Sequence, residues 1–287
     1  MLKLVANWFI EDKQMRYTIQ TGKYVFKNFF YVILFAIIPA VALSLSLAKE
    51  EIARVLNAII VGDFSTWTFS DLFCSISVLN FSSWHSVTTG IIGVIAIVPC
   101  VALLMAFLDK HLRFGKRTFN GLWPKLNDNF ISTFGYTCFF LMIYEAWALL
   151  LSALLFFVSL IPNAITVYVV GGAIFVAMHV VLLNAVGAIY LWLPCMQITG
   201  FHAVEALQYS HQLVTSVKWK ILVGQLFLLF LTEGVIMACA RYLPEFAIFT
   251  GVTSVLFILL MLFYCVRMMI AYFDRDHIDR ADLRKYY

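Results

Sequence analysis

A run of 59 residues, from Ala146 to Val204, contains no Asp, Glu, Lys or Arg. A helix that crosses a hydrocarbon core of about 30 Å needs roughly 20 apolar residues. The run is therefore long enough for two membrane spans and the turn between them, which we place near Pro162. This pattern predicts a multi-pass membrane protein.

Other uncharged stretches of similar length bring the predicted number of spans to six. The third and fourth are longer than the core requires, so these helices tilt, extend beyond it or include interfacial turns. We expect an all-α polytopic membrane helix bundle, with residues 1–273 as a single transmembrane domain and 274–287 as a cytoplasmic charged tail. The predicted spans lie near residues 28–48, 87–108, 130–158, 164–192, 221–240 and 246–271.

The gaps between these spans differ sharply in their basic residues. Lys and Arg near span ends stay preferentially on the cytoplasmic side of a membrane. Alternate gaps hold 16 of them, and the opposite gaps hold only Lys49, Arg54 and Arg241. This split places both termini in the cytoplasm. The remaining base, Arg267, lies near the inner end of the sixth span, where we expect its long side chain to reach the interface.

A polar or amphipathic stretch with aromatic and basic residues precedes each predicted hairpin on the cytoplasmic side, at residues 8–27, 119–129 and 201–219. Apolar residues recur at near-helical spacing in the third stretch, which is typical of a helix lying at the interface. These residues are Phe201, Val204, Leu207, Leu213 and Val214. We therefore predict three tandem units, each an interfacial elbow helix followed by a transmembrane hairpin.

The segment 49–86 is the long external loop of this layout. Its residues 50–61 can form a short helix on the outer surface. The aromatic residues that follow suit an interfacial belt, and a re-entrant or lid-like segment is the open alternative. They are Trp67, Phe69, Phe73, Phe81 and Trp84.

Composition agrees with the pattern, since 63% of the residues are hydrophobic and 13% are charged, against about 25% charged in a soluble domain. The six cysteines show no paired spacing, so we expect packing residues rather than disulfides. The first 27 residues do not follow the pattern of a cleaved signal peptide, so we expect the first span to be retained.

Three ionisable residues fall inside predicted spans, where such residues are costly and are candidates for function. Counted at 1.5 Å per residue from the cytoplasmic ends, Glu145 lies roughly 22 Å deep, His179 about 20 Å and Glu233 about 18 Å. Packed together they would form an intramembrane polar cluster able to relay protons or bind a cation. The alternative is that each residue is simply hydrogen-bonded within the bundle. Asn184 and Gln225 can join such a network or bond a neighbouring helix.

Metal and cofactor chemistry has little support in the sequence. His202 and Glu205 are three residues apart on the third elbow, but His211 does not repeat that helical face, so we predict no metal site. Cys-x-x-Cys, Walker, His-Glu-x-x-His and Gly-x-Ser-x-Gly elements are absent, and we expect no cofactor. In the tail, Asp276 and Arg280 are four apart, which is typical of a solvated helix.

The third elbow also carries a candidate motif. It consists of Ala206, Leu207, Ser210, Leu213 and Trp219. The motif resembles one in the membrane domain of glycerophosphodiester phosphodiesterases and its stand-alone bacterial multi-pass relatives, and the ending Tyr264-x-x-Arg267 is similar to the same group. The resemblance implies a membrane-domain fold. Because spans, elbows and tail occupy the sequence, we expect no soluble phosphodiesterase domain and carry over no catalytic residue.

These observations favour a non-enzymatic integral protein of the cell membrane with a scaffold, accessory or membrane-homeostasis role. The expected partners are membrane lipids and a protein bound at the tail or elbow helices, and nothing suggests nucleic acid. The main alternative is a small-solute or ion transporter that uses the polar cluster for proton coupling. An intramembrane or lipid-modifying enzyme is a third reading, but no serine or threonine has a recognisable catalytic neighbourhood.

Overall fold

The computed structural model describes residues 16–215 and 218–283, and within these ranges the fold is all-α with no strand. Five helices are long and apolar enough to cross a membrane, and the bent pair near the N-terminus makes a sixth if it is counted as one span. The helical bundle predicted from the sequence is confirmed, and its apolar helices fit a multi-pass membrane protein. The long helices are α7 (Trp84–Phe114), α8 (Leu122–Ser159), α9 (Ala164–Ile189), α12 (Lys218–Tyr242) and α13 (Phe246–Arg275).

The first predicted span is broken rather than straight. Helix α3 (Phe29–Val32) and the 3-10 turn η1 (Ile33–Phe35) meet α4 (Ile37–Ser46) at a bend of 53°. Pro39 explains the position of the bend, because a proline has no N–H and its ring clashes with the carbonyl four residues earlier. That carbonyl belongs to Phe35, the last residue of η1.

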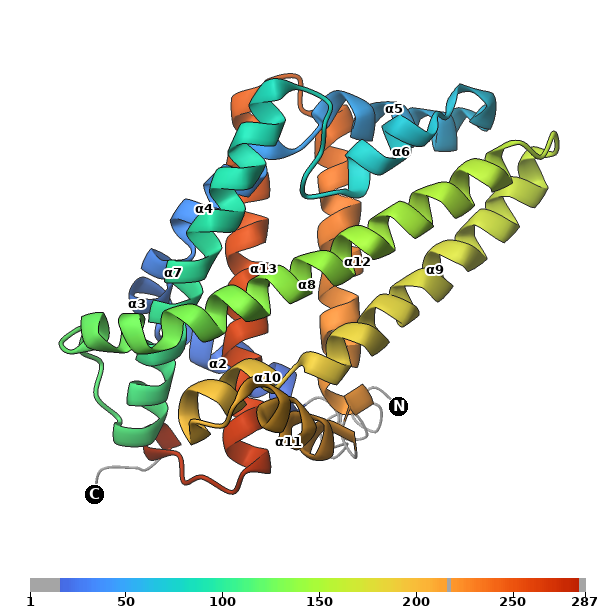
Figure 1. Ribbon diagram of the computed structural model, residues 1–287. Helices are drawn as coiled ribbons and strands as arrows, with labels where there is room; N and C mark the ends of the chain where they lie inside the picture. Colours follow the sequence, from blue (N-terminus) through green and yellow to red (C-terminus); the bar gives the residue numbers. More distant parts are fainter. Residues whose placement is uncertain (1–15, 216–217, 284–287) are drawn as a thin grey trace, which may run out of the picture.

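Helices α8 and α9 form a hairpin that runs obliquely past α12 and α13 (Figure 1). The 38 residues of α8 correspond to about 57 Å of helix, well beyond the thickness of a hydrocarbon core. At the turn, the side chain of Asn163 accepts hydrogen bonds from the backbone N–H groups of Ile165 and Thr166 at 2.9 and 3.3 Å. This cap fixes the start of α9.

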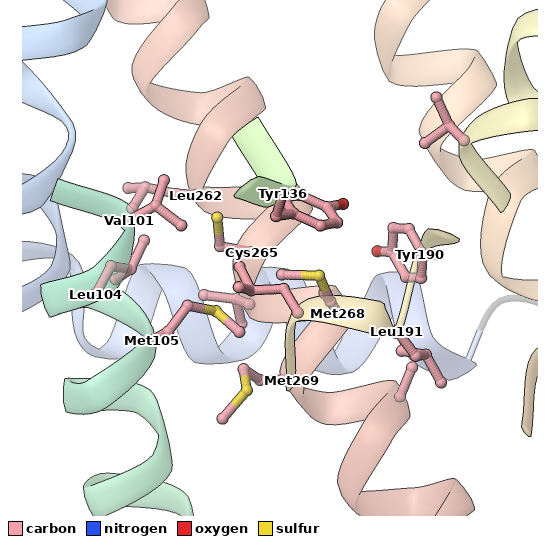
Figure 2. Close-up of a cluster of buried hydrophobic side chains, with 14 of the residues drawn as sticks. Val101, Leu104, Met105, Tyr136, Tyr190, Leu191, Leu262, Cys265, Met268 and Met269 are labelled. Carbon is pink, nitrogen blue, oxygen red and sulfur yellow. The ribbon is translucent and has the colours of Figure 1, made fainter. Parts of the chain in front are cut away.

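The main core surrounds the C-terminal half of α13, where every residue from Cys265 to Phe273 is buried. A helix that is buried on all sides must be enclosed by its neighbours. Figure 2 shows Leu262, Met268 and Met269 of α13 pointing toward side chains of α7, α8 and the α9–α10 junction. The C-terminal half of α13 is therefore the centre of the molecule.

Close helix contact in the bundle depends on Gly93 of α7. A Cβ at this position would lie 2.8 Å from Leu43 Cδ2 and 3.2 Å from the backbone nitrogen of Leu43. Because even one added carbon atom would overlap Leu43 Cδ2 and crowd the α4 backbone, glycine favours the close approach of α4 and α7.

Two of the three predicted elbows are separate helices. The described part of the first is α2 (Arg16–Lys27), and the third is α11 (Ala203–Thr215), which follows the short helix α10 (Trp192–Pro194) and the π-helical turn η3 (Cys195–Thr199). The second elbow differs from the prediction, since most of its residues form the beginning of α8. Pro124 is the third residue of α8, and the first turn of a helix tolerates proline because its N–H groups need no helical partner.

The segment predicted to form the external loop contains the predicted short helix, α5 (Lys49–Val61), followed by η2 (Phe64–Thr66) and α6 (Phe69–Ile76). Gly62 ends α5 with a φ of 79°, a left-handed conformation that glycine adopts without strain. Arg54 of α5 and Asp71 of α6 form an ion pair at 2.8 Å. Figure 1 shows α6 directed back toward the long helices, and this course positions the first polar site.

Candidate functional site

His179 of α9 is completely buried inside an aromatic enclosure. The centroid of its ring lies 4.3 Å from that of Phe175, 4.8 Å from that of Phe230 and 4.9 Å from that of Trp147. Phe175 belongs to α9, Phe230 to α12 and Trp147 to α8. Three spans thus remove this imidazole from solvent.

Both ring nitrogens of His179 have partners. Nδ1 lies 2.8 Å from the carbonyl oxygen of Phe175, one turn earlier in α9. Nε2 lies 3.0 and 3.1 Å from the two carboxyl oxygens of Glu233 in α12. The contact therefore joins the second transmembrane hairpin to the third.

The available donors and acceptors limit the ways in which His179 and Glu233 can form their hydrogen bond. Because a carbonyl oxygen can only accept, Nδ1 must donate to Phe175. Nε2 then either donates as an imidazolium to a carboxylate or accepts from a protonated carboxyl group. In both arrangements one hydrogen joins His179 Nε2 to the carboxyl group of Glu233.

Glu233 is the accessible member of the pair. Its side chain is 29% exposed, whereas that of His179 is 0% exposed. The pair is therefore closed on the histidine side and accessible on the carboxyl side.

Glu145 of α8 binds a different part of the molecule. Its carboxylate accepts hydrogen bonds from Ser77 Oγ at 2.6 Å and from the backbone N–H groups of Val78 and Leu79 at 3.0 and 3.1 Å. These three donors follow the C-terminus of α6. The carboxylate thus satisfies backbone groups of an irregular segment, which apolar surroundings would otherwise leave unpaired.

Two further contacts hold the same segment. Tyr144 donates a hydrogen bond from its hydroxyl to the carbonyl oxygen of Ile76 at 2.9 Å. Asn80 donates one from its side chain to the carbonyl oxygen of Ser46, at the end of α4. The segment after α6 is therefore fixed between α8 and α4.

The structure brings together two of the three residues predicted to form one cluster. His179 and Glu233 are paired, whereas Glu145 has its own partners in the segment after α6. The rings of Tyr144 and Trp147 lie between these sites, with centroids 5.4 Å apart. The three residues therefore do not form the single cluster that the sequence predicted.

Arg267 is a buried polar residue of α13. The prediction that its side chain reaches the interface is wrong, because the residue is only 1% exposed. Its Nη1 donates to Gln225 Oε1 at 3.3 Å, and its guanidinium packs beside Gly224 of α12. The burial of α13 on all sides explains the difference, because its side chain has no route to the surface.

No protein-family model, curated protein or solved structure matches this chain.

The elbow motif packs in the way its residue types suggest. Ala206 and Ser210 are completely buried, and Trp219 is 51% exposed. Leu207 and Leu213 are half-buried, and the carbonyl oxygen of Leu213 accepts a hydrogen bond from Arg275 Nε at 3.2 Å. The small side chains allow α11 to lie close against its neighbours.

His202 and Glu205, which the sequence places three residues apart, have a structural role in this elbow. A carboxylate oxygen of Glu205 accepts a hydrogen bond from the backbone N–H of His202 at 3.2 Å. This is the reciprocal half of a helix cap, and it leads into α11. The described residues contain no group of three or more His, Cys, Asp or Glu side chains placed to hold a metal. Cys74, Cys195 and Cys265 are buried, and all six cysteines are free.

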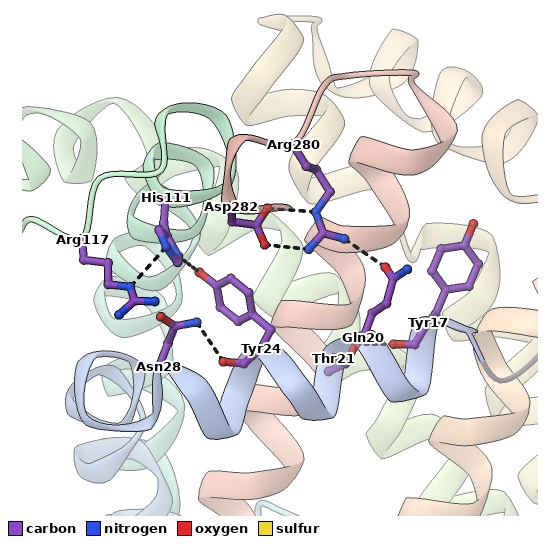
Figure 3. Close-up of polar contacts among 9 residues, drawn as sticks. All are labelled: Tyr17, Gln20, Thr21, Tyr24, Asn28, His111, Arg117, Arg280 and Asp282. Carbon is purple, nitrogen blue, oxygen red and sulfur yellow. Dashed lines mark hydrogen bonds and ion pairs between the residues drawn. The ribbon is translucent and has the colours of Figure 1, made fainter. Parts of the chain in front are cut away.

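The described part of the tail, residues 274–283, folds back onto the bundle (Figure 3). Arg280 binds Asp282 at 2.9 Å and also donates to Gln20 of α2 at 3.0 Å. The solvated helix predicted from the spacing of Asp276 and Arg280 is not formed, because α13 ends at Arg275. Asp276 instead accepts hydrogen bonds from Tyr209 and Tyr272.

Another polar contact joins α2 to α7, next to the tail. The hydroxyl of Tyr24 lies 2.5 Å from His111 Nδ1, and Arg117 donates to His111 Nε2 at 3.4 Å. Burial raises the pKa of Tyr24 well above its ordinary range, and the neighbouring Asp282 raises it further. The phenol therefore remains protonated throughout the physiological range.

Proposed function

We propose that this chain is a non-enzymatic integral membrane protein with a scaffold or accessory role in the cell membrane. The observation that carries the proposal is the use of its intramembrane ionisable residues as connections between segments. His179 and Glu233 join α9 to α12, and Glu145 holds the segment after α6. Buried polar groups with these partners specify one arrangement of helices.

The proposed orientation places both termini in the cytoplasm. It is supported by the 16 basic residues in one set of gaps against three in the other. In this orientation α2, α11 and the described tail lie on the cytoplasmic side, where the elbows and the tail offer surfaces to a protein partner. The α5–α6 segment lies outside.

A relationship to the membrane domain of glycerophosphodiester phosphodiesterases remains part of this proposal. It is supported by the elbow motif, whose small residues Ala206 and Ser210 are buried and whose Trp219 is exposed at the start of α12. The proposal concerns the membrane fold and attributes no hydrolysis to this chain.

Proton-coupled transport of a small solute or ion is the second candidate. The specific observation that favours it is the single proton shared by His179 and Glu233, together with the 29% exposure of the Glu233 side chain. A carboxyl group that is open on one side and bonded to an imidazole on the other can exchange a proton.

One experiment separates the two candidates. The full chain is reconstituted into liposomes that contain a pH-sensitive dye, and internal pH is followed after an imposed pH gradient and a potassium diffusion potential. A scaffold predicts the same proton flux with wild-type protein, with Glu233→Gln and with protein-free liposomes. A wild-type flux well above the protein-free rate that Glu233→Gln abolishes would establish transport and overturn the scaffold proposal.

Unfolding of the same variants measures the structural role directly. Glu233→Ala leaves the buried Nε2 of His179 without a partner, which costs about 1–3 kcal/mol. Glu233→Gln retains an N–H donor for Nε2, so we expect a smaller loss. Equal stability of Glu233→Ala and wild type in detergent would contradict the proposed connection.

A further inference from the structure

An apolar groove of about 660 Å³ lies between α8, α9 and the elbow helix α11, apart from the polar pair. The small side chains of Ala185 and Ala188 leave the space, and larger apolar residues form the remaining walls. The apolar lining consists of Phe139 and Ile143 of α8, Ala185, Ala188 and Ile189 of α9, and Leu207 of α11.

One edge of this groove is polar. Gln208, His211 and Gln212 line it from α11, and all three are exposed. The groove thus combines an apolar interior between two spans with hydrogen-bonding groups along one helix. Its volume falls within the range of sites for small ligands, about 300–1,000 Å³.

A cationic side chain, that of Lys218, follows the end of α11 by three residues. Lys218 Nζ donates to Asn184 Oδ1 at 2.5 Å, and Asn184 directly precedes the groove residue Ala185. Trp219, the next residue after Lys218, is 51% exposed and suits the headgroup level. Positive charge at the polar edge of an apolar groove complements a ligand with an anionic head and a hydrocarbon tail.

We propose that this groove binds an anionic glycerophospholipid. Its acyl chain lies between α8 and α9, and its phosphate faces His211 and Lys218. A lipid is the occupant that the surroundings supply, because apolar spans border the groove on one side and a polar helix borders it on the other. The proposal goes beyond the scaffold role and requires only that the chain is embedded in a membrane.

Photo-crosslinking tests the position of the acyl chain. The full chain is placed in phosphatidylcholine nanodiscs that contain a small fraction of phosphatidylglycerol with a diazirine in one acyl chain. We expect crosslinks to concentrate in peptides covering residues 139–143 and 185–189. Even labelling of all lipid-facing helices would overturn the proposal.

Two alanines of α9 provide a matched comparison. Ala188→Phe fills the groove, whereas Ala177→Phe adds the same side chain at an exposed position of α9 outside it. We expect Ala188→Phe to reduce crosslinking of 139–143 at least fivefold and Ala177→Phe to leave it unchanged. Equal effects of the two variants would contradict binding in the groove.

Competition with the wild-type chain needs no variant that must fold. Unlabelled phosphatidylglycerol should displace the probe, additional phosphatidylcholine should do so weakly, and glycerol 3-phosphate should have no effect because it lacks the acyl chain.

A single basic residue near a membrane surface contributes about fivefold to binding of anionic lipid. Lys218→Gln should therefore reduce the preference for the anionic lipid by about this factor, and an unchanged preference would refute the role of charge.

Discussion

At the scale of single residues, the membrane-embedded carboxylates have unequal surroundings. Glu233 shares a proton with one buried imidazole. Glu145 accepts three hydrogen bonds, two of them from backbone N–H groups. The same residue type thus serves as a proton-sharing group in one place and as a backbone anchor in another.

Replacement of Glu145 should release the segment after α6. Glu145→Ala removes the acceptor of the Val78 and Leu79 N–H groups, and unpaired groups of this kind cost about 1–3 kcal/mol each. We expect hydrogen exchange at these two amides to become at least tenfold faster. Glu50→Ala, at an exposed position of α5, is the control. Unchanged protection in Glu145→Ala would show that the carboxylate does not hold the segment.

Tyr209 gives the α11–tail contact a pH dependence. Its hydrogen bond to Asp276, with a smaller effect of burial, raises the pKa of Tyr209 from 10.0 to about 12. As pH rises, the unfolded chain loses this proton first, so the contribution of Tyr209 to stability is complete below pH 10 and is lost between about pH 10 and 12.

Tyr209→Phe should remove this alkaline dependence and lower stability below pH 10 by about 1 kcal/mol. Thermal unfolding in detergent from pH 8 to 12 measures both effects. Tyr242→Phe, which changes an exposed tyrosine at the end of α12, is the control. The assignment fails if Tyr209→Phe and wild type lose stability in parallel above pH 10.

At the scale of elements, the contact between α4 and α7 predicts different effects of two glycine substitutions. A Cβ on Gly93 would collide with Leu43, whereas one on Gly172 of α9 would meet no atom within 4 Å. Gly93→Ala should cost about 1–3 kcal/mol because α4 and α7 must separate. Gly172→Ala should be neutral or stabilise by up to about 1 kcal/mol through helix propensity. Unfolding of both variants in one detergent provides the comparison, and a neutral Gly93→Ala would rule out a tight contact.

Helix existence was predictable from the length of apolar runs, whereas helix boundaries depended on local chemistry. The position of Pro39 accounts for the break in the first span, and Pro124 sits where a helix can contain it. The second elbow therefore becomes part of α8, although its composition resembles that of the other two elbows. Amphipathic composition alone does not distinguish a separate interfacial helix from the extension of a span.

The pairing within the candidate site was not predictable from the sequence. Counting residues placed His179 and Glu233 at similar depth, but their contact also depends on the rotation of α9 and α12 about their axes. The partners of Glu145 are a serine hydroxyl and two backbone N–H groups, which leave no recognisable pattern in the sequence. The burial of Arg267 depends on the helices that surround α13, and no property of its own segment indicates it.

At the scale of the whole molecule, the proposed membrane orientation determines on which side each connecting segment lies. Ser70→Cys lies in the α5–α6 segment and Thr118→Cys in the α7–α8 connection, and both positions are exposed. The proposed topology predicts that a membrane-impermeant maleimide labels Ser70→Cys in intact cells and labels Thr118→Cys only after the membrane is opened. The reverse pattern would invert the topology. The unsubstituted chain corrects for labelling of the native cysteines.

The central position of α13 has a consequence for biogenesis. This helix leaves the ribosome after the other long helices described above, yet its half from Cys265 to Phe273 is enclosed by elements made earlier. During synthesis, the surfaces that later pack against α13 therefore stay uncovered and face lipid or a membrane chaperone. These surfaces belong to α2, α7 and the α9–α10 junction. Final packing can begin only when the sixth span arrives, so assembly of this protein is a post-insertion event rather than a sequential addition of finished hairpins.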